Sequence, residues 1–271
     1  MASKSAFRKT IVKRELRGEG HSEEPPVKLR RSPTIKLNKP EPSASLPQKR
    51  TRAALKASHP AVASIRCEDT LAEALAVLRA RDPALIERVL SVTGPPPLRL
   101  RPPDLAGLAW IVVSQQVSVA SANAIYARVI ARFPGFDPIH ILAASDEDLR
   151  ACGLSSPKMR TLRALAKAVL DGAINFDALA LMEAADAHRS LIAIHGIGPW
   201  TADIFLMFCL GHPDAWPVGD LALQEAARMV LNLRQRPDAR RLEKIGERWR
   251  PVRGVAARLL WAWYGVARKP A

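Results

Sequence analysis

The chain has 271 residues, 48% of them hydrophobic, which is enough to bury a sizeable core and excludes a chain that is disordered throughout. Lys and Arg outnumber Asp and Glu by 41 to 26, and the formal net charge of +15 favours a polyanionic partner. No apolar run approaches the roughly 18–20 residues of a membrane span, and the N-terminus lacks the apolar segment of a secretory signal, so we expect no membrane partner.

The first segment, residues 1–58, is basic and broken by prolines. It holds 15 of the Lys and Arg residues and 5 of the Asp and Glu residues, so it carries +10 and leaves +5 for the rest. Its few apolar residues cannot offset the entropy lost on ordering, and we predict a disordered basic arm. Such an arm either neutralises phosphates or serves as a solubilising tail. The folded domain is expected over residues 59–271.

Beyond the arm, segments rich in Ala, Leu, Val and Ile have helical length, end at Gly or Pro, and show almost no strand-type alternation. This pattern predicts an all-α fold. Helices are expected over Leu71–Arg81, Pro83–Ser91, Leu105–Gln115, Val119–Phe133, Asp146–Cys152, Pro157–Leu170, Phe176–Leu181, Ala187–Ile194, Pro199–Leu210, Leu221–Leu231, Ala239–Arg248 and Val252–Val266. Val92–Pro103 contains five prolines, which cannot continue a helix, and is expected to be a stiff connector.

A tight turn between two helices is predicted within Leu191–Asp203, whose sequence is LIAIHGIGPWTAD. Gly196 and Gly198 allow positive φ and a close approach of the backbone to a ligand, and Pro199 begins the second helix with its first amides free. Free amides at a helix N-terminus bind an anion, here a nucleic-acid phosphate. Taken alone, Gly-x-Gly also fits an ordinary helical hairpin.

A carboxylate follows the hairpin at the start of the next helix. After a loop containing Pro213 and Pro217, Val218-Gly219-Asp220 leads into LALQEAARMVL. Asp220 is a candidate catalytic carboxylate, and the simpler reading is that it only caps the helix. The hairpin and the aspartate in this order are far rarer than either part, which favours the catalytic reading.

These two motifs, in this order, resemble the helix-hairpin-helix DNA glycosylase superfamily. Further segments add to the likeness: Ala109–Val119 (AWIVVSQQVSV), Gly153-Leu154 with Lys158, Trp249-Arg250-Pro251, and Leu260–Tyr264 (LWAWY). The resemblance covers about residues 65–268 and is greatest to the DNA-3-methyladenine glycosylase II (AlkA-type) branch. It implies a two-lobed helical fold, with two subdomains and the active-site cleft between them.

The resemblance implies a base excision repair enzyme that flips an alkylated purine, such as 3-methyladenine or 7-methylguanine, out of DNA and hydrolyses its N-glycosidic bond. Asp220 would stabilise the positive charge that develops on the deoxyribose. Bifunctional relatives carry a lysine nucleophile where this chain has Trp200, so a monofunctional hydrolase without AP lyase activity is expected. No cysteine follows Cys209, so no iron–sulfur cluster is expected.

The family positions also assign the base pocket. Trp200 and Trp263 would flank the flipped base and favour its positive charge, while Ile204 stands where close relatives have a tyrosine and would make the pocket more apolar. The alternative for a tryptophan on the last helix is a place in the core, which we expect for Trp261 and keep open for Trp263.

DNA contacts are expected from Gln116, Gly196, Gly198 and Thr201. Gln116 would wedge into the gap left by the flipped base, although a polar residue at a helix end can also simply face solvent. No side-chain metal site is expected. The resemblance implies that backbone carbonyls near Ile194, Gly196 and Ile197 can hold Na⁺ or K⁺.

The expected partner is double-stranded DNA with damaged bases, bound by a monomer in the cytoplasm with the nucleoid, or in a eukaryotic nucleus. The main alternative is a non-catalytic helix-hairpin-helix DNA-binding module. Asp220 and Trp200 argue against it, because a module that only binds DNA phosphates needs neither an acid after the hairpin nor a tryptophan beside the turn. A second alternative is an adenine-type or oxidised-base glycosylase, which would need the iron–sulfur cluster or the lysine nucleophile that this chain lacks. A third is a helical scaffold with a basic tail, which would not explain the two motifs in their order.

Overall fold

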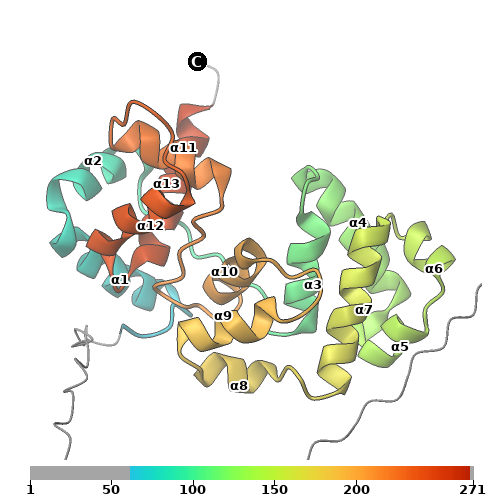
Figure 1. The fold of residues 1–271 in the computed structure, drawn as a ribbon. Coiled ribbons are helices and arrows are strands. Elements are labelled where there is room, and N and C mark those ends of the chain that lie inside the picture. The colour runs from blue at the N-terminus through green and yellow to red at the C-terminus, as the bar shows by residue number, and fades with distance from the viewer. Residues whose placement is uncertain (1–61, 269–271) are drawn as a thin grey trace, which may run out of the picture. The chain divides into compact units, whose positions relative to one another are not determined.

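The computed structural model describes residues 62–268, which form helices joined by loops, with no strand among them (Figure 1). The all-α prediction is therefore confirmed for this part of the chain. The predicted basic arm, residues 1–58, lies outside the described residues. Among the helices that the structure describes, none combines the length and the apolar character needed to span a membrane.

One group of helices comes from the middle of the chain. It consists of α3 (Leu105–Ser114), α4 (Val119–Arg132), the 3-10 turn η1 (Pro134–Phe136), α5 (Pro138–Ala143), α6 (Asp146–Ala151) and α7 (Ser156–Leu170). Helix α7 packs against α3, α5 and α6, and α3 packs against α4. Leu108 and Ile111 on α3 and Leu162 and Leu165 on α7 are fully buried, so the two helices share an apolar core.

A second group combines the two ends of the described chain. It consists of α1 (Glu68–Arg81), α2 (Pro83–Thr93), α11 (Leu221–Val230), α12 (Ala239–Gly246), the 3-10 turn η2 (Glu247–Trp249) and α13 (Arg253–Ala267). Helix α13 packs against α1, α2 and α11. The chain thus leaves this group through the connector after α2 and returns to it at α11.

The remaining helices are α8 (Phe176–Leu181), α9 (Ala184–Ile192) and α10 (Pro199–Phe208), and Figure 1 shows α10 between the two groups. Helix α10 packs on α9 and α3 and is buried on most sides. Two arginines satisfy its last carbonyls: Nη2 of Arg258 donates to Met207 O at 3.0 Å, and the backbone N–H of Arg101 donates to Phe208 O at 2.9 Å. The second bond anchors the proline-rich connector beside α10.

All the predicted helices are present, with ends that differ by three residues or fewer. Two short elements, α5 and the 3-10 turn η1, were not predicted, whereas η2 lies largely within the predicted helix Ala239–Arg248. A six-residue helix is too short to show helical periodicity, although Pro138 at its start and the Asp137 side chain, which accepts the N–H of Ile139 at 2.8 Å, are ordinary start signals.

Candidate active site

The turn between α9 and α10 depends on one glycine. Gly196 has a φ of +84°, and a Cβ at this position would lie 1.9 Å from Oγ1 of Thr161 on α7. Gly198 has a φ of −90° and nothing within 4 Å of its Cβ position, so it does not need the positive φ that the sequence suggested. Gly196 therefore allows the turn to pack on α7, and Gly198 leaves the start of α10 open for a ligand.

The side chain of Thr201 faces the protein interior. It is 3% exposed, and its hydroxyl accepts a hydrogen bond of 2.8 Å from Nε2 of Gln115. The bond ties the first turn of α10 to the end of α3, and the predicted contact between Thr201 and DNA stays a prediction.

Gln116 lies in the short turn between α3 and α4 with a positive φ of +57°, and it is exposed. Lys158 on α7 fixes this turn, because its Nζ donates hydrogen bonds to the carbonyl oxygens of Val113 at 2.7 Å and Gln115 at 2.8 Å. Burial lowers the pKa of Lys158. The arrangement presents Gln116 to solvent on a backbone that is fixed on the side facing α7.

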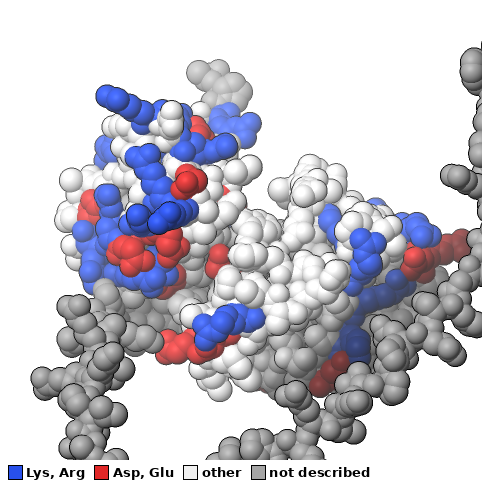
Figure 2. Space-filling model, in the orientation of Figure 1, with Lys and Arg blue, Asp and Glu red and all other residues white. Residues whose placement is uncertain are grey.

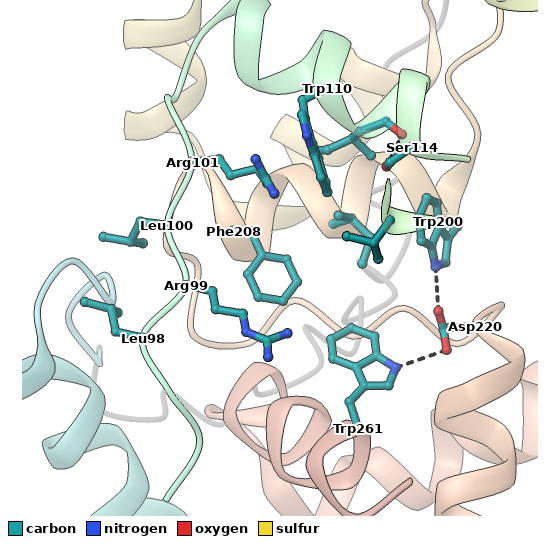
Figure 3. A pocket seen from close by; sticks show the side chains of 13 residues that line it. Leu98, Arg99, Leu100, Arg101, Trp110, Ser114, Trp200, Phe208, Asp220 and Trp261 are labelled. Carbon is teal, nitrogen blue, oxygen red and sulfur yellow. Dashed lines mark hydrogen bonds between the residues drawn. The ribbon is translucent and has the colours of Figure 1, made fainter. Parts of the chain in front are cut away.

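Asp220 caps α11 and is held by three N–H donors, of which Figure 3 shows the two from tryptophan side chains. Its Oδ1 accepts the backbone N–H of Leu223 at 2.7 Å and Nε1–H of Trp261 at 3.1 Å. Its Oδ2 accepts Nε1–H of Trp200 at 2.8 Å. These donors and the N-terminus of α11 stabilise the carboxylate's negative charge and fix its orientation. The capping role and a chemical role are therefore compatible.

A cavity of about 600 Å³ opens beside this carboxylate. Its walls come from the connector, from α3, α4, α10 and α13, and from the N-cap of α11. The lining residues are Leu98, Arg99, Leu100, Arg101, Trp110, Ile111, Ser114, Val119, Trp200, Ile204, Phe208, Asp220 and Trp261. Figure 2 shows a hollow between the two helix groups whose visible walls consist mainly of residues other than Lys, Arg, Asp and Glu. The lining is mainly apolar and aromatic, with the Asp220 carboxylate and the arginines Arg99 and Arg101 as its charged groups, a composition typical of a pocket for an organic ligand.

The family model of the HhH-GPD superfamily base excision DNA repair proteins matches residues 109–251, more than half of the chain. The chain belongs to this superfamily. The match includes the hairpin and Asp220, so the superfamily predicted from these motifs is confirmed.

Two relatives with similar sequences are named as DNA-3-methyladenine glycosylases. DNA-3-methyladenine glycosylase of Bacillus subtilis is 28% identical over 172 residues, which are 59% of this chain and 57% of the relative. DNA-3-methyladenine glycosylase 1 of Schizosaccharomyces pombe is 32% identical over 156 residues, 55% of this chain and 68% of the relative. The chain thus spans little more than half the length of the Bacillus subtilis protein.

Solved structures agree with the helix-hairpin-helix fold. The 3-methyladenine DNA glycosylase of Schizosaccharomyces pombe, solved with abasic DNA, has a TM-score of 0.63 and 28% identity over 70% of this chain and 95% of that one. A DNA-3-methyladenine glycosidase from Bacillus halodurans has a TM-score of 0.63 and 34% identity over 71% of this chain and 89% of that one.

Among the predicted base-binding residues of this superfamily member, Trp200 and Ile204 line the cavity and Trp263 does not. Trp261 takes that place, and Trp263 is half-buried and packs against the core cluster. Residues two apart on a helix point about 200° apart, so only one of the two indoles can face the cavity. The structure therefore places Trp261 at the cavity instead of Trp263, which corrects the expected positions of the two indoles. Ile204 is 7% exposed and forms part of an apolar wall.

Four further side chains in the cavity were missed by the sequence analysis: Arg99, Arg101, Trp110 and Phe208. The two arginines belong to the extended connector, where alternate residues share a side, so the LRLR pattern of residues 98–101 was an available signal. Trp110 and Phe208 could not be distinguished from core residues, because their helices are apolar all round.

Cations lie on the aromatic walls. The guanidinium carbon of Arg101 is 3.1 Å from the centre of the Trp110 ring, and that of Arg258 is 4.4 Å from the centre of Phe208. Phe208 in turn stacks on Trp261 at 6.0 Å between ring centres. Burial lowers the pKa of Arg101 and lowers that of Arg258 to about 10.

Within residues 62–268, no group of three or more His, Cys, Asp and Glu side chains is arranged to hold a metal ion. At the hairpin, the carbonyl of Ile194 accepts the N–H of Ile197 at 3.0 Å. A carbonyl oxygen has a second lone pair, so this bond leaves Ile194 able to contribute to a monovalent cation site.

Proposed function

We propose that this protein is a monofunctional DNA glycosylase that hydrolyses the N-glycosidic bond of alkylated purines in double-stranded DNA. The observation that carries the proposal is the Asp220 carboxylate, held by the indoles of Trp200 and Trp261 at the wall of an aromatic cavity. The named activities of the relatives support it, and so does the Schizosaccharomyces pombe structure that contains abasic DNA.

The reaction needs a group that stabilises a cationic sugar. As the bond between C1′ and the base nitrogen lengthens, positive charge develops on the deoxyribose, and a carboxylate already oriented beside it lowers the barrier without reorganising. Asp220 supplies that charge and can also orient the attacking water. The three N–H donors keep the carboxylate in place: two of them use both lone pairs of Oδ1, and the third leaves one lone pair of Oδ2 free to orient the water.

The cavity supports a flipped base as the ligand. A base leaves the duplex at a cost of a few kcal/mol, and stacking between aromatic rings offsets part of it. Trp200, Trp261 and Phe208 offer such rings next to Asp220, and Ile204 adds an apolar surface. A module that only grips phosphates would have no use for this cavity, which disfavours the non-catalytic alternative.

Hydrolysis without strand cleavage is proposed because no lysine lines the described cavity and Trp200 occupies the position of the lysine nucleophile. The assignment to the DNA-3-methyladenine glycosylase II type is part of this proposal. So is the absence of a redox cofactor, since the chain has three cysteines and none follows Cys209. We also propose that the protein acts as a monomer on DNA in the cytoplasm or in a nucleus.

The experiment is base release from otherwise identical duplexes that contain 7-methylguanine, 3-methyladenine or no lesion, followed by chromatography of the free base. The proposal expects release of the methylated bases and an abasic strand that breaks on heating with alkali. The unmodified duplex is the matched control. Binding of all duplexes without release of any base would support the non-catalytic module instead.

A further inference from the structure

The two sides of the cavity carry opposite charges. Figure 3 shows Trp200 and Asp220 on one side, and Arg99 and Arg101 reaching in from the connector on the other. Among the residues that line the cavity in the described structure, Asp220 is the one carboxylate and these two arginines are the cations. The sugar of a flipped nucleotide belongs at Asp220, so its base extends toward the arginines.

Arg101 is built into the wall and is not a free surface side chain. Its backbone N–H is bonded to Phe208 O at 2.9 Å, and its guanidinium lies 3.1 Å from the centre of the Trp110 ring. The side chain is half-buried, whereas that of Arg99 is exposed. A guanidinium that stacks on a ring by its face keeps its N–H donors in its own plane, where they can meet the edge of a bound base.

The same contact changes what the aromatic wall offers. A cationic base gains attraction from an open ring face, but Arg101 covers one face of Trp110 and Arg258 lies against Phe208. A positively charged base near Arg101 would also meet charge repulsion in a partly desolvated site, where such repulsion is stronger than in water. A neutral base with a carbonyl oxygen would instead accept a charge-assisted hydrogen bond.

We propose that Arg101 determines base specificity in this cavity, favouring neutral purines that carry a carbonyl, such as hypoxanthine, over cationic methylated purines. This inference rests on the glycosylase function proposed above and concerns the ranking of its substrates. Arg99 lies on the same side of the cavity and is exposed, so solvent screens its charge and its effect on a bound base is weaker.

The chemistry of the departing base gives the reason. In both reactions the bond between C1′ and the base nitrogen breaks, its electron pair stays on the base, and a water oxygen bonds to C1′. A cationic base leaves neutral and the water's proton goes to solvent. A neutral base leaves with a negative charge, spread onto its carbonyl oxygen, until it takes up the water's proton. The guanidinium of Arg101 stabilises that transient anion.

The test measures single-turnover excision of hypoxanthine and of 7-methylguanine, which both carry a carbonyl at the same ring position and differ in charge. Arg101→Met removes the charge and the donors and keeps the length of the side chain. We expect hypoxanthine excision to fall by about 10- to 100-fold, and 7-methylguanine excision to rise or to change by less than about threefold.

Two further variants make the result specific. Arg101→Lys keeps the charge but loses the planar guanidinium, and it should retain a hypoxanthine rate between those of the wild type and Arg101→Met. Arg79→Met, on α1 and outside the lining of the cavity, removes one positive charge elsewhere on the protein and should leave the ratio of the two rates unchanged.

Equal losses on the two bases in both Arg101 variants would overturn the inference and make Arg101 a packing residue. A larger loss on 7-methylguanine would overturn it as well. These outcomes leave the glycosylase function standing, because the wild-type protein still releases base. Failure of the wild type to release either base would instead refute the proposed function, and the specificity inference with it.

Discussion

Nε1 of Trp200, on the second helix of the hairpin, donates a hydrogen bond of 2.8 Å to Oδ2 of Asp220 at the start of α11. Trp200 is thus a donor that holds the carboxylate in place. Together with Trp261, which donates to the other oxygen at 3.1 Å, it holds the acid from two helices that are far apart in sequence. The ring of each tryptophan can serve the base while its N–H serves the acid.

Trp200→Phe and Trp261→Phe separate these two roles, because phenylalanine keeps an aromatic ring and removes the donor. Each variant should lower the single-turnover excision rate by about tenfold on charged and neutral bases alike, the value of one hydrogen bond to a charged group. Trp200→Ala should lower excision of 7-methylguanine further, since the ring's attraction for a cation, roughly 0.5–2 kcal/mol, is also lost.

Trp263→Phe is the matched control, because Trp263 lies outside the lining of the cavity. Its excision rate should stay within about twofold of the wild-type rate if its ring only packs against the core, as conservative apolar exchanges cost little. A loss in Trp263→Phe equal to that in Trp261→Phe would contradict the assignment of Trp261, instead of Trp263, to the cavity.

The reaction type can be tested by chemical trapping. Borohydride should trap no covalent protein–DNA adduct, because the cavity in the described structure has no lysine to form a Schiff base. The product strand should break only after alkali or heat. A bifunctional glycosylase on its own substrate duplex serves as the positive control for trapping, and an adduct with the present protein would overturn the monofunctional assignment.

Gly196→Ala should destabilise the fold. The position has a φ of +84°, and an added Cβ would meet the Thr161 side chain at 1.9 Å. We expect the free energy of unfolding to fall by on the order of 1–3 kcal/mol, measured by urea denaturation. Gly198→Ala is the matched control, with a φ of −90° and open space, and should change stability by less than about 1 kcal/mol. Similar losses in both variants would contradict the distinct roles of the two glycines.

Asp203, a buried carboxyl on α10 that does not line the cavity beside Asp220, should make stability depend on pH. Burial raises its pKa to about 7, Arg253 opposes this shift, and Glu243 adds to it. Because the folded state holds the proton up to about pH 7 and the unfolded chain releases it near pH 4, stability should fall as the pH rises between these values.

Asp203→Asn should remove this pH dependence. At pH 8 the variant should be more stable than the wild type by on the order of 2 kcal/mol, with the gap closing towards pH 5, as measured by urea denaturation at both values. His188→Gln controls for the neighbouring imidazole, whose Nε2 lies 3.6 Å from Oδ1 of Asp203. A gap that is the same at both pH values would refute the role of the buried carboxyl.

The elements that depend on local sequence could be predicted. Pro199 marks the start of α10, and Gly219 and Asp220 mark the start of α11, because capping and helix start signals act within a few residues. The cavity could be predicted only in part. Whether Trp261 or Trp263 faces it depends on the rotation of α13, and the approach of Arg101 to Trp110 depends on where the connector packs on α10. Both are set by contacts between distant segments.

Asp220→Asn tests whether the Asp220 carboxylate performs the chemistry. Asparagine keeps an oxygen that can accept the N–H of Leu223 and removes the negative charge. Single-turnover excision should fall by at least about a thousandfold, while the affinity for an abasic-site duplex changes by less than about threefold, because the charge acts on the transition state. Excision at the wild-type rate, or a loss of affinity as large as the loss of rate, would show that the Asp220 charge does not act on the transition state.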